Sequence, residues 1–227
     1  MKKIGKFFAL IALLAFGAIN TKADSKAVCN EVCVMDKVIE YIRNQAIELV
    51  DYEVDYVAPT LIAEGKKFSG KEYGFALVEA YEMNYGEKNT HKQVAHCAAI
   101  FEYLPNRADT NVICSKGINE EARIDFKGEY FTIVFENNDF RNRKVYKNYT
   151  TFKFIDDDFY LYQYSREYFK AGDGEGQFVP DKTDIFYRQP RDDKNKSVLI
   201  PISVVNQPFR ENLEKQCYKS GKCKDKC

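Results

Sequence analysis

The feature that most limits how this chain can fold is a series of short apolar segments, each bounded by turn residues, that begins near residue 75. The segments are rich in Val, Ile, Phe and Tyr, which favour pleated strands, and the Gly, Asn and Asp residues between them favour tight turns. The pattern predicts antiparallel strands at 75–83, 94–103, 111–115, 122–126, 130–136, 149–155 and 159–164.

Past residue 170 the strand pattern is interrupted by a glycine-rich stretch, 171–180, which we expect to be a loop. Two further strands are expected at 185–189 and 197–205. Residues 209–213 are expected to open a final short helix.

Between residues 24 and 52 apolar residues recur at alternating steps of four and three, which is the spacing of a helix with one apolar face. We expect this amphipathic helix to pack against the sheet. Its apolar stripe comprises Val28, Val32, Met35, Ile39, Ile42, Ala46 and Leu49.

These patterns together predict an α+β fold, in which the N-terminal amphipathic helix packs on a mostly antiparallel β-sheet and disulfides stabilise the structure. Residues 53–74, in which Pro and Gly recur, are interpreted as a connection between helix and sheet that contains one short strand near 60–63. The antiparallel β domain would span 75–205, and a cysteine-rich tail would follow at 206–227.

The first 23 residues have the order of a secretory signal peptide: a lysine-rich start, an apolar run at 7–19, and small residues that end at Ala23. The apolar run is shorter than the roughly 20 residues that a membrane-spanning helix needs. We therefore expect cleavage after Ala23, no membrane span in the mature chain, and a periplasmic location, with secretion as the alternative.

The charge balance argues against nucleic acid as a partner. Cleavage of the signal removes four lysines from a chain with 34 basic and 34 acidic residues, which leaves 30 and 34. A mildly acidic chain without a basic cluster lacks the electrostatic footprint on which nucleic-acid affinity depends.

The chain has seven cysteines, and in an oxidising compartment disulfides are their default fate. One arrangement joins Cys29 to Cys227 and Cys33 to Cys223 through two facing helices, because each of these end pairs is spaced by four residues. Cys97 and Cys114 would then bond between neighbouring strands, and Cys217 would be free to form a covalent dimer. Other pairings stay open, since the lysine-rich tail need not be helical. The cysteines are Cys29, Cys33, Cys97, Cys114, Cys217, Cys223 and Cys227.

Three segments resemble a strand meander of small exported bacterial proteins of uncharacterised role. They read KGEYFTIVFENND and YTTFKFIDDDFYLYQYS within 127–165, and HCAAIFEYLPN at 96–106. The shared residues are core aromatics and turn formers. The resemblance implies an antiparallel sheet and an exported setting, and it implies no catalytic residue.

The histidines offer a weak case for catalysis. His96 stands beside Cys97, but adjacent residues of a strand point to opposite faces, so the two side chains should not meet. We expect His96 to be a surface histidine, on the face opposite the cysteine. The spacing of a thiol oxidoreductase and the common hydrolase and nucleotide motifs do not occur in this sequence.

Metal sites are also disfavoured. A zinc site built from the three tail cysteines competes with disulfides, and the acidic stretches at 156–158 and 172–176 do not complete the ligand series of a calcium loop. Both stretches are better interpreted as solvated turns, and no cofactor is expected.

A cluster of tyrosines in the later strands is the best candidate for a binding surface, because tyrosine buries a ring while it keeps a polar tip exposed. The same residues could instead border the core of the sheet. We expect an exported, non-enzymatic protein that binds a protein or envelope component, as an inhibitor or immunity factor would. The alternative is a small periplasmic hydrolase whose acidic residues converge only in the fold. The candidate tyrosines are Tyr146, Tyr149, Tyr160, Tyr162, Tyr164 and Tyr168.

Overall fold

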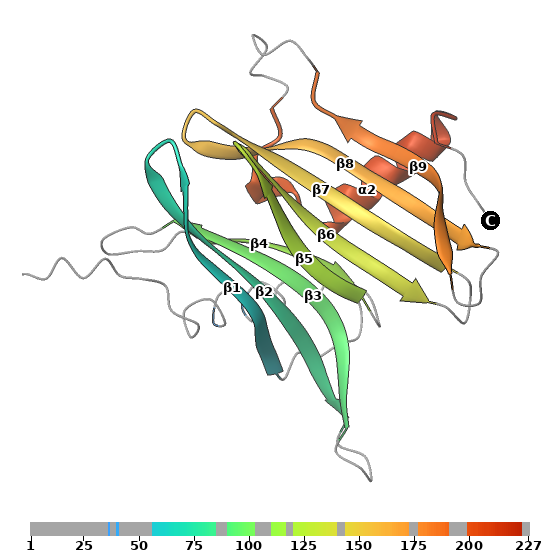
Figure 1. The fold of residues 1–227 in the computed structure, drawn as a ribbon, viewed down its shortest axis with the longest axis horizontal. Helices are drawn as coiled ribbons and strands as arrows, with labels where there is room; N and C mark the ends of the chain where they lie inside the picture. Colours follow the sequence, from blue (N-terminus) through green and yellow to red (C-terminus); the bar gives the residue numbers. More distant parts are fainter. Residues whose placement is uncertain are drawn as a thin grey trace, which may run out of the picture.

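The computed structural model describes Asp36, Glu40 and most of the chain from residue 56 onward. The described ranges are 56–84, 90–102, 110–116, 120–139, 144–172, 177–190 and 199–223. Within these ranges the chain forms nine strands in two antiparallel sheets, followed by a C-terminal helix (Figure 1).

Each sheet is a meander in which every strand pairs with its neighbour in the sequence. The first sheet contains, in order, β1 (Tyr56–Phe68), β2 (Lys71–Asn84), β3 (Thr90–Glu102) and β4 (Thr110–Lys116). The second sheet contains β5 (Glu120–Lys127), β6 (Tyr130–Asp139), β7 (Lys144–Ile155), β8 (Asp158–Ala171) and β9 (Phe178–Arg188).

The expected α+β fold with an N-terminal helix on the sheet is wrong, because the described chain is mostly β. Its long helix, α2 (Gln207–Lys219), follows the strands, where only a short helix was expected. The expected signal peptide and N-terminal helix lie outside the described residues, apart from Asp36 and Glu40. No helix in the described part of the chain is both long and apolar enough to cross a membrane.

The stretch interpreted as a connection, 53–74, contains β1 and the start of β2. Pro and Gly are typical of connections, but an edge strand with bulges also tolerates them. β1 is an edge strand, and its pairing with β2 shifts register between Pro59 and Leu61 and again between Ala63 and Lys66. The turn after β1 has positive φ at both central residues, Ser69 and Gly70, and glycine adopts this conformation without steric cost.

The strand expected at 197–205 is also wrong. One bridge joins Pro201 to Tyr160 of β8, and the chain then turns into η2, a short 3-10 helix at Ile202–Val204. Asn206 is the N-cap of the following helix, α2, because its side chain accepts a hydrogen bond from the N–H of Phe209 at 2.9 Å.

The two sheets pack face to face through an aromatic core at one end. Phe68 lies 5.1 Å from Phe159 between ring centroids, and Phe75 lies 5.1 Å from Phe131. These edge-to-face contacts join β1 and β2 to β6 and β8, and each pair contributes about 1 kcal/mol beyond its burial. The core therefore fixes how the first sheet sits on the second.

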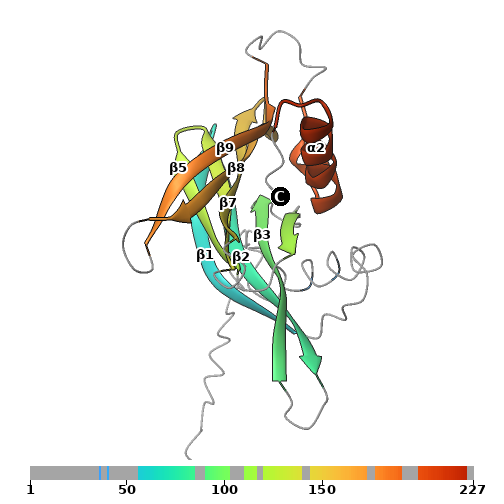
Figure 2. The same cartoon turned by 90° about the vertical axis from the view of Figure 1, so that its right-hand side faces the viewer.

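The inward faces of β7 and β8 change from apolar to polar along their length. Phe152 and Leu161 are fully buried at the aromatic end, whereas Asn148, Tyr164 and Arg166 occupy the equivalent inward positions further along. Helix α2 covers this polar end and contacts both β9 of the second sheet and β4 of the first (Figure 2). The polar end is thus enclosed by both sheets and the helix.

Two disulfides lie within the described residues. Cys97 is bonded to Cys114, directly opposite in the β3–β4 register, which is the expected bond between neighbouring strands. Cys217 is bonded to Cys223, so the expected pairing of Cys33 with Cys223 and the free Cys217 that would have linked a dimer are both wrong. A bond over six residues needs only a local turn after α2, and the helix ends at this turn. Cys29, Cys33 and Cys227 lie outside the described residues.

Candidate functional site

A pocket of about 190 Å³ lies beneath α2 at the polar end of the space between the sheets. We call it the α2 pocket. Its walls come from β4, β7, β8 and α2, and its lining residues are Ser115, Tyr146, Asn148, Tyr164, Arg166, Gln207, Arg210, Glu211 and Glu214.

The β7–β8 register places the sheet side of the pocket. Asn148 is opposite Arg166, and Tyr146 is opposite Tyr168, so these side chains share the inward face. On α2, Arg210, Glu214 and Tyr218 recur every four residues and therefore face the sheet together. The pocket forms where this helix stripe meets the polar part of β7 and β8.

Arg166 is held by three neighbours. Its Nη2 lies 2.8 Å from Oε1 of Glu214 in a salt bridge, and its Nε donates to Oδ1 of Asn148 at 2.7 Å. The guanidinium group also lies 4.7 Å from the ring centroid of Tyr146. Since both partners of the salt bridge are only 16% exposed, the pair is protected from solvent screening.

Tyr164 completes this group, because its hydroxyl donates a hydrogen bond to the same carboxylate oxygen of Glu214. Burial raises the pKa of Tyr164 well above its ordinary value, and the nearby carboxylate of Glu214 raises it further. The phenol therefore stays neutral and serves as a donor. Glu214 thus joins Tyr164 and Arg166 of β8 to α2.

Arg210 differs from Arg166 because no carboxylate neutralises it. The residue is only 4% exposed, and no acidic oxygen among the described residues lies within 4.0 Å of its guanidinium group. Its Nη2 donates to the main-chain carbonyl of Cys114, and its buried Nε has no acceptor. Removing a charge from water without a counterion costs several kcal/mol, so Arg210 is a destabilising feature of the fold.

Aromatic rings provide part of the environment of Arg210. Its guanidinium carbon lies 5.6 Å from the ring centroid of Phe135 and 6.0 Å from that of Tyr164. Such cation–π contacts contribute about 1 to 2 kcal/mol when desolvated, which offsets only part of the cost of burial. The positive charge is therefore held at the pocket wall and is only partly compensated.

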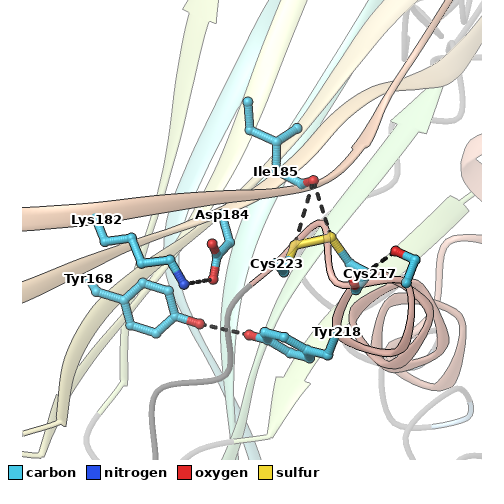
Figure 3. The surroundings of a disulfide bond; sticks show 8 residues. Tyr168, Lys182, Asp184, Ile185, Cys217, Tyr218 and Cys223 are labelled. Atoms are coloured by element: carbon cyan, nitrogen blue, oxygen red, sulfur yellow. Dashed lines mark hydrogen bonds and ion pairs between the residues drawn. A yellow bond between two sulfur atoms is a disulfide. The ribbon is translucent and has the colours of Figure 1, made fainter.

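The C-terminal end of α2 is anchored to β8 and β9 (Figure 3). The hydroxyl groups of Tyr168 and Tyr218 lie 2.8 Å apart in a hydrogen bond. Both sulfurs of the Cys217–Cys223 disulfide face the carbonyl oxygen of Ile185, at 3.7 and 4.0 Å. These contacts hold the helix that roofs the α2 pocket.

The six candidate tyrosines do not form one surface, because strand alternation divides them between the two faces of the second sheet. The inward ones include two that line the α2 pocket, and Tyr168 lies beside it. The outward ones include Tyr149, which donates to Glu167 at 2.8 Å, and Tyr162, which packs on Tyr130. The inward group is Tyr146, Tyr164 and Tyr168, and the outward group is Tyr149, Tyr160 and Tyr162.

His96 is 4% exposed, so the expectation of a surface histidine is wrong. Strand alternation places it on the inward face of β3 with Ala98, which belongs to the core between the sheets. Its Nδ1 lies 4.0 Å from Oε1 of Glu79 on β2. Cys97 is in a disulfide, so its sulfur is not available as a nucleophile.

The acidic stretches that were considered as metal ligands do not form a metal site in the described part of the chain. Asp156 and Asp157 form a tight hairpin turn with positive φ, and Asp157 lies 3.8 Å from Nζ of Lys71. The acidic residues at 173–176 lie outside the described ranges. Among the residues that are described, no three His, Cys, Asp or Glu side chains gather as metal ligands would.

The charged residues of the pocket were not among the candidates predicted from the sequence. Arg210 and Glu214 occupy the same helix stripe as buried Cys217, and Arg166 has the inward parity of Tyr164 and Tyr168. A charge at an otherwise inward position was the available signal, because such residues are rarely buried without a specific role.

Comparison of this chain with models of known protein families, with curated protein sequences and with solved structures found no match. The resemblance of the strand meander to small exported bacterial proteins stays a prediction.

Proposed function

We propose that this chain is an exported, periplasmic binding protein that holds a small ligand in the α2 pocket and does not transform it. The observation that carries the proposal is the pocket itself, in which polar side chains from two sheets and a helix converge on one concave site. Ligand sites in proteins are typically concave and use converging polar groups to orient the ligand.

The chemistry of the pocket walls supports binding. Glu214 accepts hydrogen bonds from both Tyr164 and Arg166, so its carboxylate, the Tyr164 hydroxyl and the Arg166 guanidinium group are engaged in holding α2 on the sheet. Groups that are engaged with one another present a preorganised surface, which lowers the entropic cost of binding.

The size of the pocket narrows the kind of ligand. Cavities of roughly 150 Å³ hold a benzene-sized molecule, so about 190 Å³ suits a small ligand or the end group of an envelope component. The division of the six tyrosines between two faces favours this interpretation over a flat aromatic docking surface for a protein.

The disulfides support an exported location. Cys97–Cys114 and Cys217–Cys223 are bonds of a kind that persists in the periplasm and outside the cell, where thiols are oxidised.

The pocket can be tested by filling it. Ser115 is 8% exposed and lines the pocket from β4, so Ser115→Phe should occupy the space that a ligand needs. Ser203→Phe, at an exposed position in η2, is the matched control. The full exported chain would be isolated from its own cells, and native mass spectrometry would detect any small molecule that stays bound.

We expect wild type and Ser203→Phe to carry the same small mass, and Ser115→Phe to carry none. Thermal unfolding in added periplasmic small-molecule extract gives a second readout, because a ligand that binds only the folded state raises the melting temperature. A wild-type chain that neither retains a ligand nor responds to the extract contradicts the proposal, as does a Ser115→Phe chain that behaves like wild type.

A further inference from the structure

We infer that the α2 pocket is a carboxylate-binding site and that Arg210 is the residue that contacts the bound carboxylate. This inference rests on the proposed binding function and adds the chemical class of the ligand. The starting observation is a guanidinium group that is 4% exposed, lines a pocket and has no carboxylate partner among the described residues.

The charged residues of the pocket differ in whether a counterion or water already balances their charge. Arg166 and Glu214 form a salt bridge at 2.8 Å, so neither needs a ligand to balance its charge. Glu211 is exposed and accepts a hydrogen bond from Gln207 at 2.9 Å, and water can solvate its charge. Arg210 is left as the buried charge that an incoming anion would neutralise.

Arg210 also has donors to offer. Its side-chain hydrogen bonding is limited to Nη2, which donates to the carbonyl of Cys114, and Nε has no acceptor. A guanidinium group presents its N–H bonds in a planar fork that matches the two oxygens of a carboxylate. A bound carboxylate would therefore supply both the missing charge and the missing acceptors.

The neutral residues of the lining suit the rest of such a ligand. Ser115, Asn148 and Gln207 place polar side chains in the lining, and Tyr146 and Tyr164 also border the pocket. Together with a volume of about 190 Å³ these groups fit a small organic acid.

The acidic residues of the lining favour a singly charged ligand. Glu214 and Glu211 both line the pocket, and like charges in a partly buried site repel strongly. A phosphate dianion would bring a second negative charge against these carboxylates, whereas one carboxylate balances Arg210 alone.

Three probes of nearly the same shape test the inference: benzoate, benzamide and benzylamine, which are anionic, neutral and cationic at neutral pH. Their affinities for the full exported chain would be measured by calorimetry at constant ionic strength, with inorganic phosphate as a fourth probe. The variants are Arg210→Gln, Arg210→Lys and, as the matched control, Arg188→Gln. Arg188 is an exposed arginine of β9 that bonds to Gln163.

We expect wild type and Arg188→Gln to bind benzoate about tenfold to a hundredfold more tightly than benzamide, which is the range for a charged hydrogen-bonded pair. Benzylamine should bind most weakly. Arg210→Gln should lose this preference and keep its affinity for benzamide, and Arg210→Lys should retain part of it because the charge remains while the fork is lost. Retained benzamide binding shows that Arg210→Gln is folded.

The inference is overturned if wild type does not bind benzoate, if benzamide or benzylamine binds as tightly, if phosphate binds more tightly than benzoate, or if Arg210→Gln retains the preference. A wild-type chain that binds benzamide, with that binding lost in Ser115→Phe, keeps the proposed function even when the carboxylate assignment fails. The two claims therefore fail separately.

Discussion

Arg210 of helix α2 donates a hydrogen bond from Nη2 to the main-chain carbonyl of Cys114 in β4, across 96 residues of sequence. β4 is an edge strand of the first sheet, so its outer carbonyl groups are available to the helix. The same helix is joined to the second sheet through Glu214 and Arg166. α2 thus connects two sheets that otherwise meet at the aromatic core, and the α2 pocket lies between these connections.

Replacing Arg210 by Met should stabilise the ligand-free protein. The apolar side chain has a similar length and removes an uncompensated buried charge, so we expect the free energy of unfolding to rise by about 1 to 3 kcal/mol. Urea denaturation followed by circular dichroism would measure the change. Arg188→Met, at an exposed position, should stay within about 0.5 kcal/mol of wild type. A loss of stability in Arg210→Met would mean that the charge is balanced within the fold.

Removing Glu214 should have the opposite effect. Glu214→Gln leaves Arg166 without its counterion, and we expect the free energy of unfolding to fall by about 2 to 4 kcal/mol. The double variant Glu214→Gln with Arg166→Gln should lose less than the sum of the two single changes, because each single change breaks the same pair.

The control for this pair is the exposed salt bridge between Lys170 and Asp181, at 3.4 Å, where Lys170 is 64% exposed. Lys170→Gln, which removes the exposed partner, should cost less than about 1 kcal/mol. Equal losses at the two sites would show that burial of the Glu214 pair has no energetic consequence.

The positions of most strands follow from the sequence, whereas the division into two sheets and the pocket do not. Turn residues and alternating aromatics located most strands from β2 onward, and the register placed Cys97 opposite Cys114. Only a short part of the edge strand β1, near 60–63, was expected to be a strand, because its Pro and Gly lie at bulges, which local propensity alone does not reveal. The pocket depends on which strand face α2 covers, so Arg166 and Arg210, 44 residues apart, could not be joined from local pattern.

The two disulfides should differ in their contribution to stability. Cys97–Cys114 closes a loop of 17 residues and Cys217–Cys223 one of 6. The loop-entropy relation gives about 3 kcal/mol for the first and about 2 kcal/mol for the second. The paired replacements Cys97→Ala with Cys114→Ala and Cys217→Ala with Cys223→Ala, compared by urea denaturation, check this order. A larger loss for the second pair would show that anchoring the end of α2 outweighs loop entropy.

The raised pKa of Tyr149 predicts how the free energy of unfolding changes at alkaline pH. Burial, together with a hydrogen bond to Glu167, raises the pKa of Tyr149 to about 12. The unfolded chain releases this proton near pH 10, so the folded state binds more protons between about pH 10 and 12. The stabilisation is complete below pH 10 and is lost as the pH rises toward 12.

Tyr149→Phe should therefore flatten part of the decline in the free energy of unfolding across this window, measured by urea denaturation at a series of pH values. Other buried tyrosines contribute to the remaining decline, because burial raises the pKa of Tyr73, Tyr164, Tyr187 and Tyr218 as well. Glu167→Gln should flatten the decline by a smaller amount than Tyr149→Phe. A slope identical to that of wild type in both variants would contradict the assignment.

The most direct test of the α2 pocket is a crystal structure of the chain purified from its own cells without exchange of bound molecules. We predict electron density for a small molecule beneath α2, with two oxygen atoms of a carboxylate within hydrogen-bonding distance of the Arg210 guanidinium group. Density for water alone in the pocket, or a ligand bound on the outward face of the second sheet beside Tyr149 and Tyr162, would contradict the account.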